Sequence, residues 1–211
     1  MKKIIEFLLD IFFTPVVLSL LATIFAMGVI ILTTSCSKQQ TVVVESTPLK
    51  VREALLYAKN NDMDTTVCIL VDFTKPSSEK RMALVDLQTE KVISRGLVCH
   101  GMGRTYSSTP QFSNDVNSHL SSLGRYRIGS RAWSQWGIHI KYVLHGLDST
   151  NSNAEQRYVV LHSWSAIPDS VEGKIVSIAE GYGCPAVSNN YMLSLDTVLR
   201  GRKDVLLWIY V

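Results

Sequence analysis

The chain has 211 residues, a formal net charge of +3, 18% charged and 46% hydrophobic residues, and four cysteines. Its charge is small and forms no block of one sign, so nothing in the composition calls for a nucleic-acid partner. Beyond the first 35 residues, the chain is long enough for one domain with a sizeable core, and a second full domain is not expected.

The N-terminus carries an uncharged, mostly apolar stretch from Ile11 to Leu32, preceded by two lysines. This stretch exceeds the ~7–15 apolar residues of an ordinary signal peptide and approaches the ~20 residues of a spanning helix. The residues that follow it resemble a bacterial lipoprotein cleavage box, in which Cys36 would receive the lipid. Residues 1–35 are therefore predicted to be a signal peptide or a membrane-anchoring helix, and either would tether the chain to a membrane outside the cytoplasm.

The next segments predict a linker, a helix and three strands in succession. Residues 36–47 are interpreted as a linker, and residues 48–63 as a helix, because apolar residues recur there at helical spacing. Apolar or alternating runs at 67–73, 81–87 and 91–98 predict strands, which polar turns join as a meander. The long polar segment 101–122 follows, and a loop of this length in a compact domain indicates cover over a site.

Strand-like runs resume at 124–132, 138–144, 157–162 and 205–211, and short helices are predicted near 171–179 and 189–199. Strands thus dominate residues 48–211 and do not alternate regularly with helices. This order predicts a mainly β (α+β) domain, built as a β-sandwich of mixed sheets, rather than a doubly wound parallel sheet.

A cysteine and a histidine carry the clearest chemical signal. Cys184 follows Gly181, Tyr182 and Gly183, and glycines can expose a sulfur and bring backbone N–H groups close to an oxyanion. His162 ends the apolar run 158–161, where a strand would hold its ring to accept the thiol proton. A carbonyl of the 181–182 turn is expected to hold the second ring nitrogen. The pair predicts a cysteine acyl-transfer site.

Four further residues are weaker candidates for substrate contact: Tyr126, His145, His100 and Trp164. Their alternatives are structural, with Tyr126 in the core and His100 in a turn, because aromatic residues and histidines in apolar runs more often serve packing. Two other cysteines, at positions 68 and 99, lie in apolar runs and are expected as buried thiols rather than as a disulfide. The histidines and cysteines lack metalloenzyme spacing, so no metal and no other cofactor is expected.

Several segments in sequence resemble the murein L,D-transpeptidase catalytic domain family, which has the YkuD-like fold. The resemblance covers roughly residue 50 to the C-terminus, in the branch with Pro-Ala after the cysteine, and depends on residues 72–73 with 77–82, 121–128, 159–162 and 183–186. It implies a β-sandwich-like domain that cuts a peptidoglycan stem peptide after its third residue and joins the acyl group to an amine. Cys184 would then be the nucleophile and His162 the base.

The chain departs from the family pattern at Gly181, Tyr182 and Ser163, where the family commonly has Ser or Thr, His and Gly. Substrate binding therefore carries over less securely than the Cys–His pair. Two alternatives stay open: an L,D-carboxypeptidase that uses the same site with water, and a non-catalytic cell-wall-binding module. In each case we expect a monomer on the periplasmic side of the cell envelope.

Overall fold

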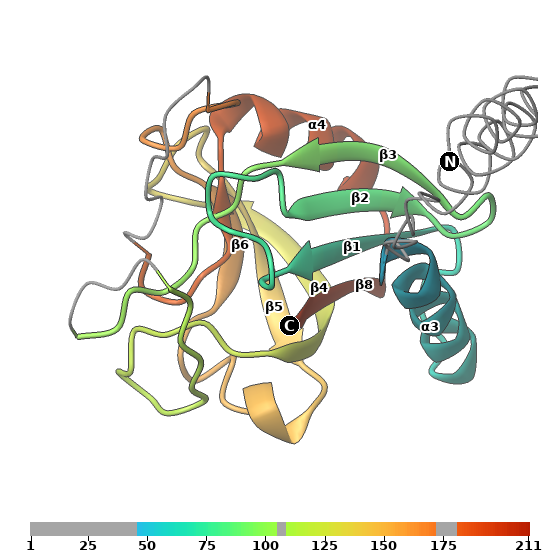
Figure 1. The fold of residues 1–211 in the computed structure, drawn as a ribbon, viewed down its shortest axis with the longest axis horizontal. Helices are drawn as coiled ribbons and strands as arrows, with labels where there is room; N and C mark the ends of the chain where they lie inside the picture. The colour runs from blue at the N-terminus through green and yellow to red at the C-terminus, as the bar shows by residue number, and fades with distance from the viewer. Residues whose placement is uncertain (1–45, 105–108, 172–180) are drawn as a thin grey trace, which may run out of the picture. The chain divides into compact units, whose positions relative to one another are not determined.

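The computed structural model describes residues 46–104, 109–171 and 181–211. Residues 1–35, Cys36, most of the linker and the helix expected near 171–179 lie outside these ranges. Among the described residues, no helix has the length and apolar character needed to cross a membrane. In chain order (Figure 1), the elements are α3 (Ser46–Asn60), β1 (Val67–Asp72), β2 (Met82–Asp86), β3 (Lys91–Gly96), β4 (Gly124–Trp133), β5 (Ile140–Gly146), η1 (Ser149–Asn151), β6 (Val160–Ser163), β7 (Ala186–Val187), α4 (Asn189–Leu199) and β8 (Val205–Tyr210).

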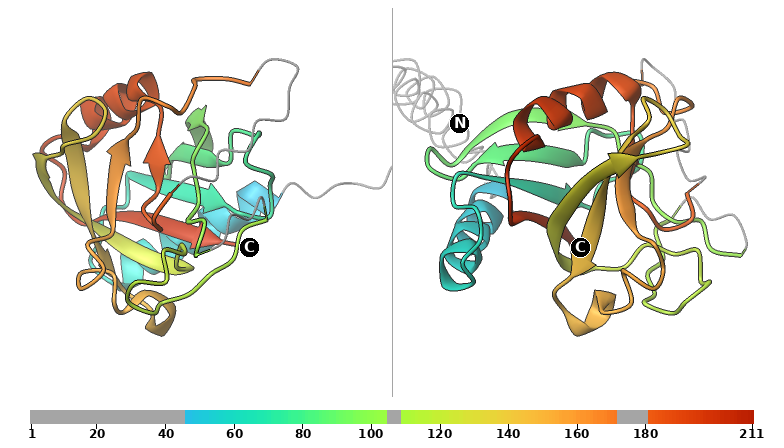
Figure 2. Two further views of the ribbon diagram at one scale, coloured as in Figure 1. Left: turned by 90° about the vertical axis from the view of Figure 1, so that its left-hand side faces the viewer. Right: turned by 180° about the vertical axis from the view of Figure 1, so that it is seen from behind.

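The strands of this part of the chain form one mixed sheet, in the order β3-β2-β1-β8-β4-β5-β6-β7. The mainly β prediction is confirmed, as is the β1–β2–β3 meander, but the predicted sandwich of separate sheets is wrong for the described residues. The reason is β8, which pairs in parallel with β1 and antiparallel with β4 and so joins the two halves. An isolated bridge between Val98 and Val187 links the two ends of this order, so the sheet nearly closes on itself. Figure 2 shows how strongly it curves.

Alternation along β1 divides the core between the two faces of the sheet. Cys68 and Leu70 face a cluster that includes the buried side of α3, whereas Ile69 and Val71 face the larger cluster, which includes α4. Cys68 is a free thiol, as is Cys99, and both are fully buried. The expectation of buried thiols rather than a disulfide is therefore confirmed.

The two helices are close to their predicted ranges. α3 begins two residues before the predicted start and ends at Asn60, three residues before the predicted end. α4 spans the predicted residues, and the Ser188 hydroxyl caps it by accepting a hydrogen bond from the Tyr191 N–H. The apolar face of α4 packs into the larger cluster immediately after β7, which fixes the end of the segment that carries Cys184.

The short strand β7 was not predicted, because two residues give no measurable alternation. It runs parallel to β6, and His162 pairs with Ala186. Since Cys184 precedes Ala186 by two residues, the same parallel register brings it beside Val160, on the side of β6 that also carries His162. The sheet thus determines which residues surround the sulfur.

Candidate active site

Two adjoining hollows form a groove, and Cys184, His162 and Trp136 line both of them. The first, of about 190 Å³, is here called the apolar hollow; its other lining residues are Cys99, Trp164, Gly181, Tyr182 and Ala186. The second, of about 290 Å³, is called the lysine hollow; its other lining residues are Trp133, Ser134, Gln135, Lys141, Tyr158 and Val160. The half-buried Cys184 and His162 therefore lie where the two hollows meet.

The backbone immediately before Cys184 strongly favours glycine. Gly183 has φ of +100°, and a Cβ there would lie 2.5 Å from the Leu120 carbonyl oxygen. The Ser121 hydroxyl donates to the Gly183 carbonyl at 3.4 Å, which fixes this peptide from its carbonyl side. At the sulfur itself, the Val160 N–H donates to Sγ at 3.5 Å, and Sγ lies 3.8 Å from the Tyr158 carbonyl. The thiol is thus held against the start of β6.

Burial raises the pKa of the Cys184 thiol above its ordinary value of 9.0, because a thiolate is poorly solvated there. The hydrogen bond from the Val160 N–H and the charges of Arg157 and Lys141 act in the opposite direction without reversing it. At neutral pH, Cys184 is therefore a thiol that needs a base before it can attack.

His162 has the ring arrangement of such a base. Its Nδ1 lies 2.9 Å from the Ser163 carbonyl oxygen, and since a carbonyl can only accept, Nδ1 carries the proton and Nε2 is left as the acceptor. Burial and the charge of Lys141 lower the pKa of His162 below 6.5, although the Ser163 carbonyl raises it. The imidazole is thus neutral at pH 7. A carbonyl does orient the ring as expected, but it belongs to Ser163 and not to the 181–182 turn.

Of the four weaker candidates, only Trp164 lines the groove. Tyr126 lies in the core, where its hydroxyl donates to the Ser122 carbonyl at 2.9 Å, because alternation along β4 turns it inward. His100 is fully buried, and its Nδ1 accepts from Arg81 Nη2 at 2.9 Å. His145 pairs with Glu155 and lines a different hollow. It lies four residues after Lys141 on β5, which is roughly 13 Å along the strand. Tyr126, His100 and His145 therefore do not line the groove.

Arg157, which the sequence did not single out, ties the polar segment to the site. Its guanidinium donates to the carbonyls of Ser113 and Leu120 and to the hydroxyls of Ser118 and Ser122. The Leu120 carbonyl is also the atom against which Gly183 packs. Through Arg157, the end of the polar segment therefore supports the turn that carries the sulfur. No local sequence signal marks this role, because all of its partners are distant in the chain.

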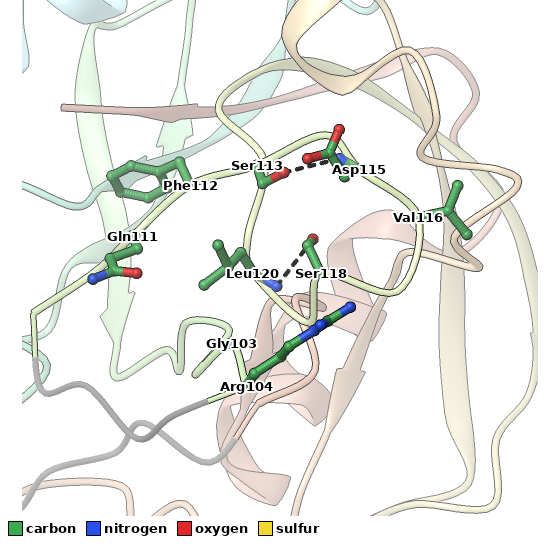
Figure 3. Close-up of a pocket in the computed structure, with 9 residues that line it drawn as sticks. All are labelled: Gly103, Arg104, Gln111, Phe112, Ser113, Asp115, Val116, Ser118 and Leu120. Atoms are coloured by element: carbon green, nitrogen blue, oxygen red, sulfur yellow. Dashed lines mark hydrogen bonds between the residues drawn. The ribbon is translucent and has the colours of Figure 1, made fainter.

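The polar segment contains a hollow of its own (Figure 3), lined by Gly103, Arg104, Gln111, Phe112, Ser113, Asp115, Val116, Ser118 and Leu120. It shares no lining residue with the groove. The segment borders the groove through His119, whose ring lies edge-on to Tyr182 with 4.6 Å between ring centroids. Among the described residues, no three His, Cys, Asp or Glu side chains gather in a way that could hold a metal ion.

Comparison with known proteins identifies the family. The family model described as the L,D-transpeptidase catalytic domain matches residues 39–210, and the chain therefore belongs to this family. Members of the family act on peptidoglycan stem peptides in the cell envelope. A search among curated proteins found no match.

Three solved structures to which the chain is similar share 12–16% of its sequence. Bd1075 of Bdellovibrio bacteriovorus is 16% identical, with 69% of this chain and 48% of that chain covered and a TM-score of 0.43. The helical cell shape determining protein Pgp2 of Campylobacter jejuni is 12% identical, with 77% and 55% covered and a TM-score of 0.44. An L,D-transpeptidase of Xylanimonas cellulosilytica is 12% identical, with 74% and 68% covered and a TM-score of 0.41. The chain spans about half the length of the first two, and the family assignment rests on the matched segment 39–210.

Proposed function

We propose that this chain is a cysteine acyltransferase that acts on peptidoglycan stem peptides by L,D-transpeptidation. One observation carries the proposal: Cys184 and His162 line the same groove, and the contact of His162 Nδ1 with the Ser163 carbonyl leaves Nε2 as a proton acceptor. Membership in the L,D-transpeptidase catalytic domain family supports it.

The proposed reaction begins with a neutral thiol and a neutral imidazole. His162 takes the proton of Cys184 as the sulfur attacks the carbonyl of the third stem residue, a base role worth roughly 10²–10⁴ in rate. The tetrahedral intermediate expels the D-amino acid, which receives the proton from His162, and a thioester remains on Cys184. An amine of a second stem peptide then attacks the thioester and releases the free thiol.

The oxyanion of the tetrahedral intermediate needs N–H donors beside the sulfur. We assign this role to the backbone of Gly181, Tyr182 and Gly183, because the turn is already fixed from its carbonyl side. The Gly181 carbonyl accepts from the Met102 N–H at 2.8 Å, and the Gly183 carbonyl accepts from Ser121. One such donor contributes about 3 kcal/mol to transition-state stabilisation.

The two-sided groove favours transfer over hydrolysis. The sulfur can be reached from the apolar hollow and from the lysine hollow, so one peptide can occupy each side. An L,D-carboxypeptidase would need only one of them. Product analysis separates the two: cross-linked dimers support transpeptidation, whereas free tripeptide stems without dimers support the carboxypeptidase.

Covalent labelling by a carbapenem tests the nucleophile and separates the enzyme from the non-catalytic cell-wall-binding module. We expect intact mass measurement to reveal one adduct on the wild-type chain and none on Cys184→Ala. Cys68→Ala is the matched control, because Cys68 is fully buried and lines neither hollow, and it should keep the adduct. A wild-type chain that forms no adduct would favour the non-catalytic module.

We further propose that the enzyme works as a membrane-tethered monomer on the periplasmic side of the envelope. The support for the tether is the sequence of residues 1–36, which lie outside the described part of the chain. The mass of the membrane-extracted protein discriminates the two tethers, because a lipoprotein begins at Cys36 with its lipid attached, whereas an anchored enzyme keeps Lys2 and Lys3.

A further inference from the structure

Lys141 lies in the groove without an acidic partner. It pairs with His162 in the register of β5 and β6, and it lines the lysine hollow together with His162 and Cys184. Its side chain is half-buried. Among the described residues, no ion pair includes Lys141.

In the described part of the chain, Lys141 lacks the acidic partner that a half-buried lysine commonly has. Removing an ammonium group from water costs free energy that a nearby carboxylate normally offsets. Lys50, also half-buried, follows this rule: it pairs with Glu53 at 2.6 Å and lies 4.4 Å from the centroid of the Trp208 ring. Lys141 has no such compensation, and its place in the groove therefore points to a ligand.

The charge of Lys141 acts directly on the reacting groups. It lowers the pKa of His162 and opposes the burial that raises the pKa of Cys184, so it lies close enough to influence both. Three large aromatic side chains, Trp133, Trp136 and Tyr158, line the same hollow. These rings are exposed in the free chain, so a peptide that covers them displaces water, and a charge pair formed beneath it is screened less than one in open solvent.

We propose that Lys141 is the carboxylate-binding residue of this groove and selects substrates that carry a carboxylate next to the scissile bond. The inference rests on the proposed function for the identity of the peptide. Two carboxylates of a stem peptide meet the requirement: the terminal carboxylate of the departing D-amino acid, and a side-chain carboxylate on the third residue. Lys141 would hold either one within reach of Cys184 and thereby position the scissile carbonyl.

Peptide pairs that differ in one carboxylate test the proposal on the full-length chain. In the first pair, one peptide ends in a free carboxylate and the other in a carboxamide. In the second pair, the third residue carries a side-chain carboxylate in one peptide and lacks it in the other. We expect Lys141→Met to lower kcat/KM about 10- to 100-fold more for the peptides with the recognised carboxylate than for their partner peptides. Lys141→Arg should restore most of the loss, and the exposed Lys91→Met on β3 is the control for net charge.

Alkylation of Cys184 tests the same site without any peptide turnover. Iodoacetate carries a carboxylate and iodoacetamide does not, yet each forms an Sγ–carbon bond and releases iodide. We expect the rate with iodoacetate, divided by the rate with iodoacetamide, to fall about fivefold at Cys184 in Lys141→Met. The same ratio should stay constant in Lys91→Met.

The outcomes separate the two proposals. If the wild-type chain leaves stem peptides intact but shows a Lys141-dependent preference for iodoacetate, the proposed function fails and the carboxylate-binding role stands. If Lys141→Met keeps both the iodoacetate preference and the discrimination between the peptide pairs, the carboxylate-binding role is overturned while transpeptidation is untouched.

Discussion

Replacing Gly183 by alanine tests whether the turn before the nucleophile tolerates any side chain. The new Cβ would lie 2.5 Å from the Leu120 carbonyl oxygen and 3.0 Å from Arg157 Nη2, at a φ of +100°. Leu120 is itself held by Arg157, so neither neighbour can move aside freely. Gly201→Ala is the matched control, because its φ of +81° is also strained but nothing lies within 4 Å of its Cβ.

The two substitutions share the cost of a positive φ and differ in the steric clash. The strained backbone costs about 1–3 kcal/mol at either glycine, and the smaller entropy of the unfolded chain returns about 0.4–1 kcal/mol in both. Overpacking against Leu120 adds about 1–3 kcal/mol at Gly183 alone. Gly183→Ala should therefore lower the free energy of unfolding by about 1–3 kcal/mol more than Gly201→Ala.

Urea denaturation of both variants measures this difference, and carbapenem labelling measures its effect on the site. We expect Gly201→Ala to label at the wild-type rate. Gly183→Ala should label at least about tenfold more slowly, because a shift of the turn misplaces the sulfur and the N–H donors. Equal stability losses and equal labelling rates in the two variants would refute the reasoning about Gly183.

Three other predictions follow from the site. The carbapenem labelling rate should fall on acidification with a midpoint below pH 6.5, since protonation of His162 removes the base and its pKa is lowered; a midpoint at or above 6.5 would contradict the assigned environment. Arg157→Lys should lower the free energy of unfolding by about 2 kcal/mol in urea denaturation, because an ammonium group cannot replace all the hydrogen bonds of the guanidinium. Iodoacetamide should modify Cys184 well before Cys68 or Cys99 in the native chain, as burial raises the pKa of Cys68 to about 12 and that of Cys99 to about 11; peptide mass mapping shows the order.

Local patterns were sufficient to predict most elements. The buried run that became β1, the alternating run that became β2 and the apolar face of α4 each carry their period within a few residues. The candidate pair of Cys184 and His162 could also be predicted, because Cys184 lies in a glycine-rich segment and His162 ends an apolar run. These features depend on neighbours in sequence.

The pairing of distant strands could not be predicted in the same way. Alternation indicates which face of a sheet a residue takes but not which strand lies beside it. The position of β8 between β1 and β4 could therefore not be predicted from the hydrophobic pattern. For the same reason, the place of Lys141 in the groove was not predicted, because Lys141 lies beside His162 only through the register of β5 and β6. It also made His100 and Tyr126 resemble site residues, although both are buried in the interior.

The most direct test of the account is the mass of the intact chain after brief mixing with a stem peptide. We predict that the wild-type chain gains the mass of the tripeptidyl group on Cys184, that Cys184→Ala gains nothing, and that His162→Ala forms the adduct roughly 10²–10⁴ times more slowly. An acyl group that still appears on Cys184→Ala, or a His162→Ala variant that acylates at the wild-type rate, would contradict the proposed site.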